Sequence, residues 1–291
     1  MKRSAALVSA AIVTATIVSA GQSRPPIAGI AHVALQTSDL SKARRFYSGL
    51  LGYSEVAPAS RPHVAVFAVN DRQRLIVRDG LPPDRDERLL AVAFATPSVG
   101  ALRDFLVARG ARVSGPAFDI EAGGRQVEVV DPDGHRVRFV EVDRNSATSA
   151  APSADRRISR RIMHAGLTIR DAAAADRFYN ATLAFSEIWR GGRTDDVTSW
   201  INMRAPESTE YLEYMLQTGS LDRRQLGTAH HVALVVPDMQ EALELVRRRL
   251  TPGDANAGAS PQIGRNRKWQ LNLYDPDGTR IELMEPWTTV R

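Results

Sequence analysis

The sequence predicts an α+β fold made of four βαβββ modules, arranged as two domains that each contain a pair of modules. Two observations lead to this prediction. The motif that begins at His32 begins again at His164, and the match continues without a gap to Glu55 and Glu187, at a constant offset of 132 residues. In addition, an Asp-Pro-Asp-Gly turn and the strand after it occur at residues 131–134 and again at residues 275–278.

The length of the repeat explains why the modules are expected in pairs. A period of about 60 residues is too long for a solenoid repeat. One small sheet also needs a partner to cover its face, so two modules are expected to pack together. We therefore expect domains at residues 29–143 and 161–287, joined by an alanine- and serine-rich linker at residues 144–160.

The first half divides into two modules by hydrophobic periodicity and turn residues. The first module is expected to contain a strand over residues 32–37, a helix from Ser38 or Asp39 to near Gly52, and strands over residues 63–69 and 74–78. The second is expected to contain a strand over residues 90–96, a helix over residues 99–109 and a last strand over residues 135–141.

The second half repeats this order of elements. Its third module begins with a strand at His164 and ends with a strand over residues 210–217. Its fourth module, residues 228–286, begins with a strand over residues 231–236 and ends with one over residues 279–284.

The first twenty residues have the features of a secretory signal peptide. Lys2 and Arg3 precede an almost wholly apolar or small stretch at residues 5–18, and small residues end at Ala20. We expect cleavage there, a periplasmic or secreted protein, and no membrane association of the mature chain. The absence of cysteine is compatible with that compartment.

Charge excludes one class of partner. The formal net charge of +5 falls to +3 without Lys2 and Arg3, and basic and acidic residues are interspersed. No basic run interleaved with aromatic residues is present, so nucleic-acid binding is not expected. We expect a small-molecule substrate and a monomer or homodimer.

Strand alternation selects candidate metal ligands in the second half. Side chains two residues apart share a face of a strand. One histidine and one glutamate from each of the last two modules can then converge, with small Gly166 and Ala233 leaving room beside the histidines; the four candidates are His164, Glu213, His231 and Glu282. Two imidazoles and two carboxylates suit one divalent cation of intermediate hardness. His230 is expected to point to the opposite face or the rim.

The first half provides an internal comparison. Alignment of the modules places Ala91 at the position of His231 and Arg138 at that of Glu282, and the strand over residues 74–78 offers no acid. Only His32 is kept, so no metal is predicted there. His63 and His135 are interpreted as surface or pocket residues.

These motifs resemble those of the vicinal oxygen chelate superfamily, which includes glyoxalase I, bleomycin- and fosfomycin-resistance proteins and extradiol dioxygenases. The resemblance rests on the first-strand histidines, the Phe-Tyr of the helix, and the closing Asp-Pro-Asp-Gly-x-x-Ile-Glu-Leu, and it covers about residues 29–287. It implies paired βαβββ modules that form a cup, the same four ligand positions, and one divalent ion (Zn, Ni, Co, Mn or Fe).

The resemblance implies metal-dependent chemistry but leaves the reaction open. The first hypothesis is a glyoxalase-like lyase or isomerase that acts on a small, oxygen-rich, anionic substrate, with Glu213 or Glu282 as catalytic proton shuttle. The alternative is an extradiol-type ring-cleaving dioxygenase, which also carries its metal in the second pair of modules. Such enzymes have further pocket histidines, and this chain has none between His164 and His230, although Tyr274 or Tyr211 could substitute.

A third hypothesis is a binding or resistance protein without catalytic activity that sequesters a small anion. A positively charged stretch with aromatic residues precedes and enters the last turn, and its candidate substrate-binding residues are Arg265, Arg267, Trp269 and Tyr274. A solvated loop explains the same stretch equally well.

Overall fold

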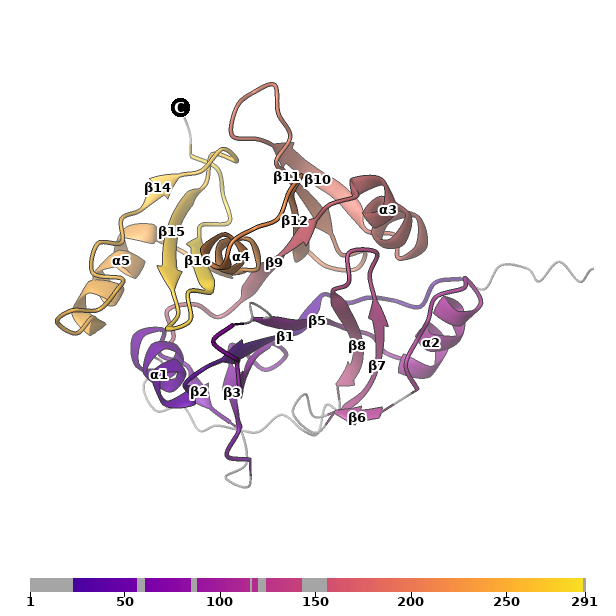
Figure 1. Ribbon diagram of the computed structural model, residues 1–291, viewed down its shortest axis with the longest axis horizontal. Helices are drawn as coiled ribbons and strands as arrows, with labels where there is room; N and C mark the ends of the chain where they lie inside the picture. The colour runs from indigo at the N-terminus through magenta and orange to yellow at the C-terminus, as the bar shows by residue number, and fades with distance from the viewer. Residues whose placement is uncertain are drawn as a thin grey trace, which may run out of the picture.

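The protein forms two eight-stranded mixed sheets, one from each half of the chain (Figure 1). The computed structural model describes residues 23–56, 61–84, 88–115, 117–119, 124–142 and 156–289. The expected signal peptide and most of the expected linker lie outside these residues. The two sheets and their few helices confirm the α+β class and the four-module plan.

The first sheet has the strand order β2-β3-β4-β1-β5-β8-β7-β6. Short helices connect its strands, and the first of them continues as a π-helix, η1. The elements are β1 (Ile30–Thr37), α1 (Leu40–Arg44), η1 (Arg45–Leu50), β2 (Ser54–Glu55), β3 (Val64–Ala68), β4 (Arg74–Asp79), β5 (Leu89–Ala95), α2 (Val99–Val107), β6 (Ala117–Asp119), β7 (Gly124–Val130) and β8 (Arg136–Val142).

The second sheet has the order β10-β11-β12-β9-β13-β16-β15-β14, which is the same arrangement strand for strand. A helix without counterpart in the first half of the described chain, α4, precedes its fourth module. The elements are β9 (Ile162–Ile169), α3 (Ala172–Asp176), η3 (Arg177–Thr182), β10 (Ser186–Gly191), β11 (Trp200–Arg204), β12 (Tyr211–Leu216), α4 (Arg223–Ala229), β13 (Val232–Val235), α5 (Met239–Arg249), β14 (Gln262–Ile263), β15 (Trp269–Tyr274) and β16 (Arg280–Met284).

The two helices of the first half begin where the sequence predicts, and α1 and α2 each have a side-chain cap, Asp39 and Ser98. The carboxylates of Asp39 and Asp171 accept backbone N–H bonds from Lys42 and Ala174 at the equivalent starts of α1 and α3. Such caps satisfy amide groups that have no partner inside the helix. The cap fixes where the chain leaves β1 and β9, and so fixes which face of each sheet the helix covers.

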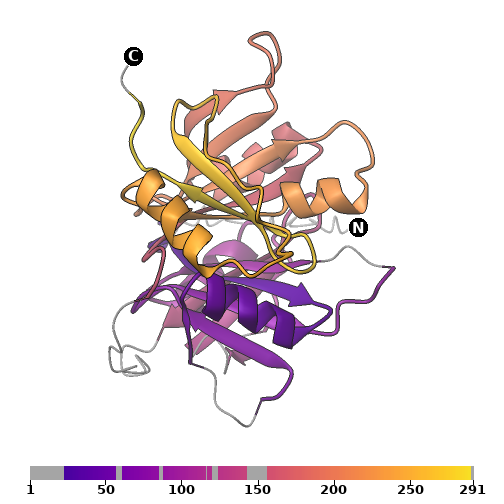
Figure 2. The same cartoon turned by 90° about the vertical axis from the view of Figure 1, so that its left-hand side faces the viewer.

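Each sheet therefore has a helix-packed face and an opposite face, which we call the inner face. The helix-packed faces of both halves contribute to one continuous hydrophobic core. Phe94 of β5 and Phe185, which follows η3, meet edge to face at 5.2 Å between ring centroids. The two halves thus pack against each other through their helix-packed faces, one above the other in Figures 1 and 2.

The two Asp-Pro-Asp-Gly turns strengthen this packing in a reciprocal way. Asp131 of the first half accepts a bond from the hydroxyl of Tyr179 at 2.9 Å. Asp275 of the second half accepts the equivalent bond from Tyr47 at 3.1 Å. Each half therefore inserts its turn against the π-helix of the other.

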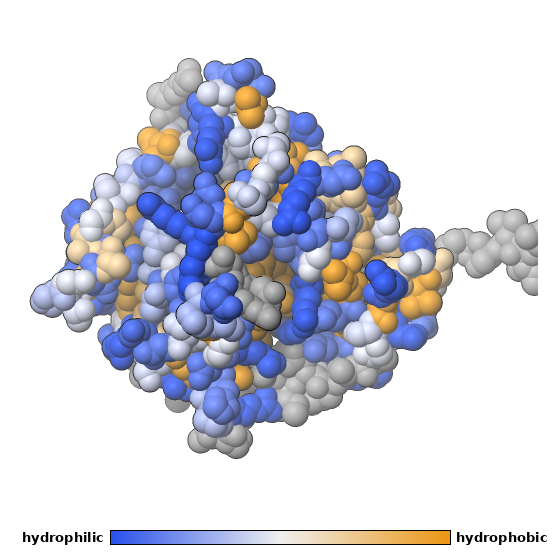
Figure 3. Space-filling model, in the orientation of Figure 1, coloured by the Kyte–Doolittle hydropathy of each residue, from blue (hydrophilic) through white to orange (hydrophobic). Residues whose placement is uncertain are grey.

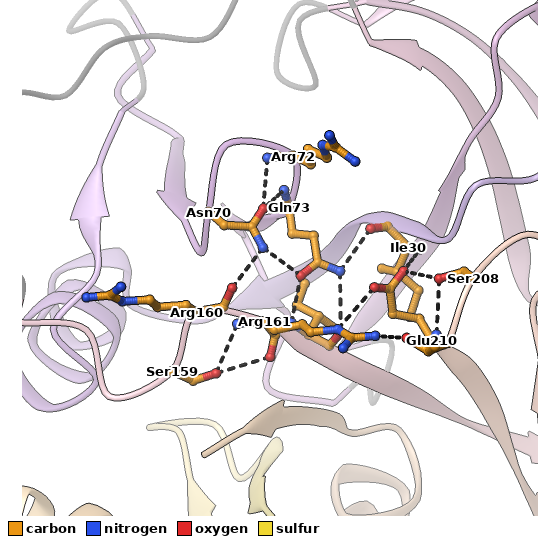
Figure 4. A network of polar contacts seen from close by, with 11 residues as sticks. Ile30, Asn70, Arg72, Gln73, Ser159, Arg160, Arg161, Ser208 and Glu210 are labelled. Atoms are coloured by element: carbon orange, nitrogen blue, oxygen red, sulfur yellow. Dashed lines mark hydrogen bonds and ion pairs between the residues drawn. The ribbon is translucent and has the colours of Figure 1, made fainter. Parts of the chain in front are cut away.

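A second polar junction joins the starts of β4 and β9 (Figure 4). The amide of Gln73 donates to the carbonyl oxygens of Ile30 and Ile162 at 3.1 and 3.3 Å and accepts from the Ile162 amide at 2.8 Å. Glu210 accepts from the backbone of Ile30 at 3.0 Å and from Arg161 at 3.3 Å. These buried bonds hold the first strands of the two halves in register.

A β-bulge interrupts simple alternation at the start of β9. His164 pairs with Ala233 and Ile162 pairs with Leu234, so Met163 is an extra residue on β9. As a result Met163 and His164 both lie on the inner face, and β1 has the same irregularity at the equivalent place. Bulges of this kind redirect a side chain, and here the redirected side chain is a predicted metal ligand.

The surface seen in Figure 3 is mainly hydrophilic, and its hydrophobic residues form small separate areas. Among the described helices, none is both long enough and apolar enough to cross a bilayer.

Candidate metal centre

Four side chains from four places in the second sheet meet on its inner face. They are His164 on β9, Glu213 on β12, His231 just before β13, and Glu282 on β16. The two imidazole Nε2 atoms are 2.9 Å apart. Glu213 Oε2 lies 3.8 and 3.2 Å from the Nε2 atoms of His164 and His231, and Glu282 Oε2 lies 3.5 and 3.8 Å from the same two atoms. The four residues predicted as ligands are thus brought together.

These distances are those of side chains that can share one ion. Ligand atoms bonded to a metal at about 2.0–2.2 Å, with angles near 90–110°, lie roughly 3–3.5 Å from one another. The five distances of 2.9–3.8 Å are of that size. One ligand atom from each of His164, His231 and Glu282 lies within 4.8 Å of the other two. Neutral imidazoles and carboxylates together suit a divalent cation, so the residues present fit a metal.

The surroundings of His231 prepare its ring for a metal. Its Nδ1 lies 2.9 Å from the carbonyl oxygen of Ala229 and donates its hydrogen there, which leaves the Nε2 lone pair facing the cluster. Gly166 makes this arrangement sterically possible. A Cβ at that position would overlap with the His231 ring and lie 2.6 Å from the Ala229 oxygen. The small residue next to the histidines therefore leaves room for a ligand side chain.

His164 is held by a tyrosine. Its ring stacks on Tyr211 with 4.5 Å between centroids. The Tyr211 hydroxyl reaches the sulfur atoms of Met163 and Met284 at 3.5 and 4.0 Å. These apolar neighbours keep the His164 ring completely buried.

Electrostatics keep both glutamates ionised and His231 neutral. Burial opposes ionisation of Glu282, but Arg280 and the two imidazoles outweigh it and hold its pKa at about 2. For Glu213, burial is likewise outweighed by His231 and His164, and its pKa is lowered. Burial lowers the pKa of His231. The ionised glutamates and the neutral form of His231 are the forms that bind a metal.

Two asparagines that sequence reasoning missed flank the glutamates. Asn202 on β11 pairs with Glu213, and Asn272 on β15 pairs with Glu282, so the four residues form two equivalent pairs. The Oδ1 atom of each asparagine is buried and has no hydrogen-bond partner in the described part of the chain. Buried polar atoms normally have partners. The only indication in the sequence was that each asparagine lies on the strand next to one that carries a candidate ligand.

The four candidate substrate-binding residues are not gathered at the cluster. Arg265 pairs with exposed Asp195, and Arg267 donates to the carbonyl of Thr289 at 2.9 Å. Trp269 packs against the main core, on the face of β15 opposite to Asn272. Residue 269 is the first residue of β15, and its side chain packs on the core side of that strand. Tyr274 is exposed at the far end of β15.

The other histidines lie elsewhere. His230 caps the end of α4 and reaches Thr168 Oγ1 at 3.0 Å and His135 Nε2 at 3.3 Å, across the junction of the two halves. It points away from the metal ligands, although Thr168 shares their face of β9. His135 also contacts Asp131 at 2.9 Å, and His63 is exposed. Only His164 and His231 contribute imidazoles to the cluster.

The first sheet lacks this constellation. Its residues at the positions of His164, Glu213, His231 and Glu282 are, in that order, His32, Ile76, Ala91 and Arg138. Within the described residues, the set of three histidine and carboxylate ligand atoms that all lie within 4.8 Å of one another is in the second sheet. The alignment made from the sequence placed Ala91 and Arg138 correctly.

Comparison with known proteins agrees with this architecture. The sequence matches the family described as Glyoxalase/Bleomycin resistance protein/Dioxygenase superfamily over residues 29–139 and 161–283. CFP32 of Mycobacterium bovis, provisionally named a glyoxylase, is 30% identical over 118 residues, which span 39% of this chain and 45% of CFP32. The chain thus covers less than half of that relative.

Solved structures extend the similarity to nearly the whole chain. A variant of homoprotocatechuate 2,3-dioxygenase from Brevibacterium fuscum has a TM-score of 0.68 at 21% identity, over 90% of this chain and 72% of that one. The 2,3-dioxygenase LapB from Pseudomonas sp. KL28 has a TM-score of 0.68 at 17% identity, over 92% and 96%. At such identities the similarity concerns the fold.

Proposed function

Because the chain belongs to the Glyoxalase/Bleomycin resistance protein/Dioxygenase superfamily, we propose that it is an exported enzyme that uses one divalent metal ion for glyoxalase-like lyase or isomerase chemistry. Its substrate is a small, oxygen-rich anion. One observation carries this proposal: a second carboxylate, that of Glu213, lies beside the group formed by His164, His231 and Glu282.

The two carboxylates have different surroundings and hence different roles. The Glu282 side chain is 4% exposed and is stabilised in its ionised form by Arg280, so it serves as a permanent ligand. The Glu213 side chain is 12% exposed and lies on the more accessible side. A carboxylate base needs access to the substrate proton that it removes. We therefore assign the proton transfer to Glu213.

The reaction requires no external oxidant or reductant. A divalent ion held by His164, His231, Glu213 and Glu282 would supply Lewis acidity toward adjacent substrate oxygens. Glu213 removes the proton from the hydroxyl-bearing carbon next to the substrate carbonyl and returns it to the carbonyl carbon. The hydroxyl proton moves to the former carbonyl oxygen, so the net change is an isomerisation. His164 and His231 hold their positions through Tyr211 and Ala229. The amides of Asn202 and Asn272 orient the substrate oxygens.

The test uses the metal-loaded protein and the hemithioacetal of methylglyoxal with a thiol, in deuterated water. We expect thioester formation and deuterium exchange at the reacting carbon. Glu213→Gln should lower turnover at least about 100-fold, as expected for loss of a general base. Asn272→Ala should raise KM more than it lowers kcat. Full turnover by Glu213→Gln would refute this assignment.

A ring-cleaving dioxygenase is the second candidate, supported by the similarity of the whole fold to LapB and to homoprotocatechuate 2,3-dioxygenase. Its test is to load the protein with ferrous iron and add a catechol under oxygen. A yellow ring-fission product would favour this candidate. The location of His135 and His230 outside the cluster argues against it. Tight anion binding without turnover in either assay would favour a binding protein.

A further inference from the structure

The inner face of the first sheet carries a row of residues that corresponds to the metal centre. The row runs across β4, β1, β5 and β8 and consists of Arg74, His32, Ala93 and Arg138. The same row in the second sheet consists of Tyr211, His164, Ala233 and Glu282. Two guanidinium groups thus replace a tyrosine and a carboxylate, and the charge of the row is inverted.

Arg74 lies on the inner face together with Ile76. The residues between and beyond them, Leu75 and Val77, belong to the main core. Ile76 belongs instead to a separate inner cluster with Ala34, Val66 and Ala91. Strand alternation then places the Arg74 side chain beside that cluster.

The guanidinium of Arg74 is buried without a counter-charge. The residue is 8% exposed, and within the described part of the chain its side chain has no hydrogen-bond or ion-pair partner. Arg138, by contrast, donates from Nε to Glu128 at 2.8 Å. A buried charge without a partner is destabilising unless a ligand compensates it. Burial also lowers the pKa of Arg74, which reflects the same cost.

We propose that the inner face of the first sheet binds a small organic carboxylate, whose head group pairs with Arg74. Guanidinium and carboxylate form two parallel N–H···O bonds. The body of the ligand is apolar, because small aliphatic side chains cluster next to Arg74 on this face; they are Ala34, Val64, Val66, Ile76 and Ala91. This site is independent of the metal centre, which lies on the other sheet.

The experiment measures binding of benzoate to the metal-loaded mature protein by calorimetry. The expected result is binding by wild type, a loss of at least about tenfold in affinity for Arg74→Met, consistent with loss of a charged hydrogen-bonded pair, and no change for Arg72→Met. Arg72 is a matched control because it lies close by in sequence and is exposed. His231→Ala should bind benzoate as wild type does.

Three outcomes would overturn the proposal. Unchanged affinity in Arg74→Met would exclude the guanidinium, and lost affinity in His231→Ala would place the anion on the metal. Binding of inorganic phosphate or uncharged benzyl alcohol in preference to benzoate would refute the ligand class.

Thermal unfolding gives a second measurement that does not depend on the affinity series. Without benzoate, Arg74→Met should melt at the same temperature as wild type or higher, because a buried unpaired charge has been removed. Benzoate should raise the melting temperature of wild type and leave that of Arg74→Met unchanged. A variant that melts lower than wild type, with no benzoate effect on either protein, would show that Arg74 has a structural role only.

Discussion

Gly166 is the residue whose size decides whether His231 can take its place in the metal centre. Its missing side chain leaves the space that the imidazole ring and the Ala229 carbonyl occupy. We expect Gly166→Ala to displace the ring and to weaken metal affinity by about 10- to 100-fold, the range observed when groups that orient a ligand are lost. Competition with a chelator measures this affinity. Gly100→Ala is the control, because a Cβ there meets nothing within 4 Å.

At the residue scale, the ligands could be predicted from the sequence because alternation holds within β12 and β16. Tyr211 and Glu213 share the inner face of β12, as expected. The bulge at Met163 could not be predicted, since it depends on how β9 pairs with β13. Asn202 and Asn272 were missed for a related reason: their importance comes from cross-strand register, which the order of residues in one chain does not specify.

At the element scale, the first aspartates of the two Asp-Pro-Asp-Gly turns make equivalent contacts with a tyrosine, but their pKa values are shifted in opposite directions. Burial raises the pKa of Asp275 to about 6. In the other turn, burial of Asp131 is outweighed by His135, and the pKa of that carboxyl is lowered. Thr279 occupies the position of His135 in the second turn, so no imidazole compensates Asp275 there.

Asp275→Asn should therefore stabilise the protein at neutral and alkaline pH. The neutral form of Asp275 is favoured in the fold, and this contribution is complete below about pH 3.8 and is lost as the pH rises through about 6. The variant stays neutral, so its advantage over wild type should grow between these values, to at most about 3 kcal/mol. Urea unfolding at several pH values measures it.

Asp131→Asn is the matched control and should show the opposite sign. Its lowered pKa means that the ionised form stabilises the fold above about pH 3.8 and that this contribution is lost on acidification. The variant should be less stable than wild type at neutral pH, and the difference should shrink in acid. Parallel pH profiles for the two variants would contradict the assigned role of His135.

The strands whose bounds were predicted from the sequence, β1, β3, β4, β5, β8, β12, β13 and β16, lie within about two residues of the prediction, because the periodicity of their buried positions is strong. The other strands were not delimited. The π-helices η1 and η3 were not predicted, since a continuous amphipathic pattern does not distinguish them from an α-helix. Trp269 was assigned to a loop because a run of charged residues precedes it. The pairing of Trp269 with Ile263 makes it part of β15 and turns it toward the core.

At the scale of the whole molecule, the shared core predicts cooperative unfolding. Residues of both halves form one hydrophobic cluster, and reciprocal bonds link the turns to the opposite halves. Calorimetry should show a single transition for the intact chain. Free divalent metal at about 100 times its dissociation constant should stabilise the protein by about 2.7 kcal/mol, and a chelator should reverse the shift. Two separate transitions would contradict the shared core.

The asymmetry between the halves predicts a stoichiometry of about one metal ion per chain. Elemental analysis after dialysis measures it. His231→Ala should leave no metal bound after dialysis, because the cluster loses one of its four ligand side chains. His32→Ala should bind as wild type does. Retention of metal by His231→Ala, together with its loss from His32→Ala, would show that the metal site lies in the first sheet and not in the second.

The proposed export predicts a mature N-terminus at Gly21.

The equivalence of the two sheets also indicates which substitutions would build a metal centre in the first sheet. Three replacements, Ile76→Glu, Ala91→His and Arg138→Glu, would rebuild the missing donor set around His32. They would not suffice, because residue 34 is alanine where the second sheet has Gly166, and its methyl group would occupy the space of the new imidazole. With Ala34→Gly added, we expect the chain to bind two ions, so four substitutions separate the two sheets in their capacity to hold a metal.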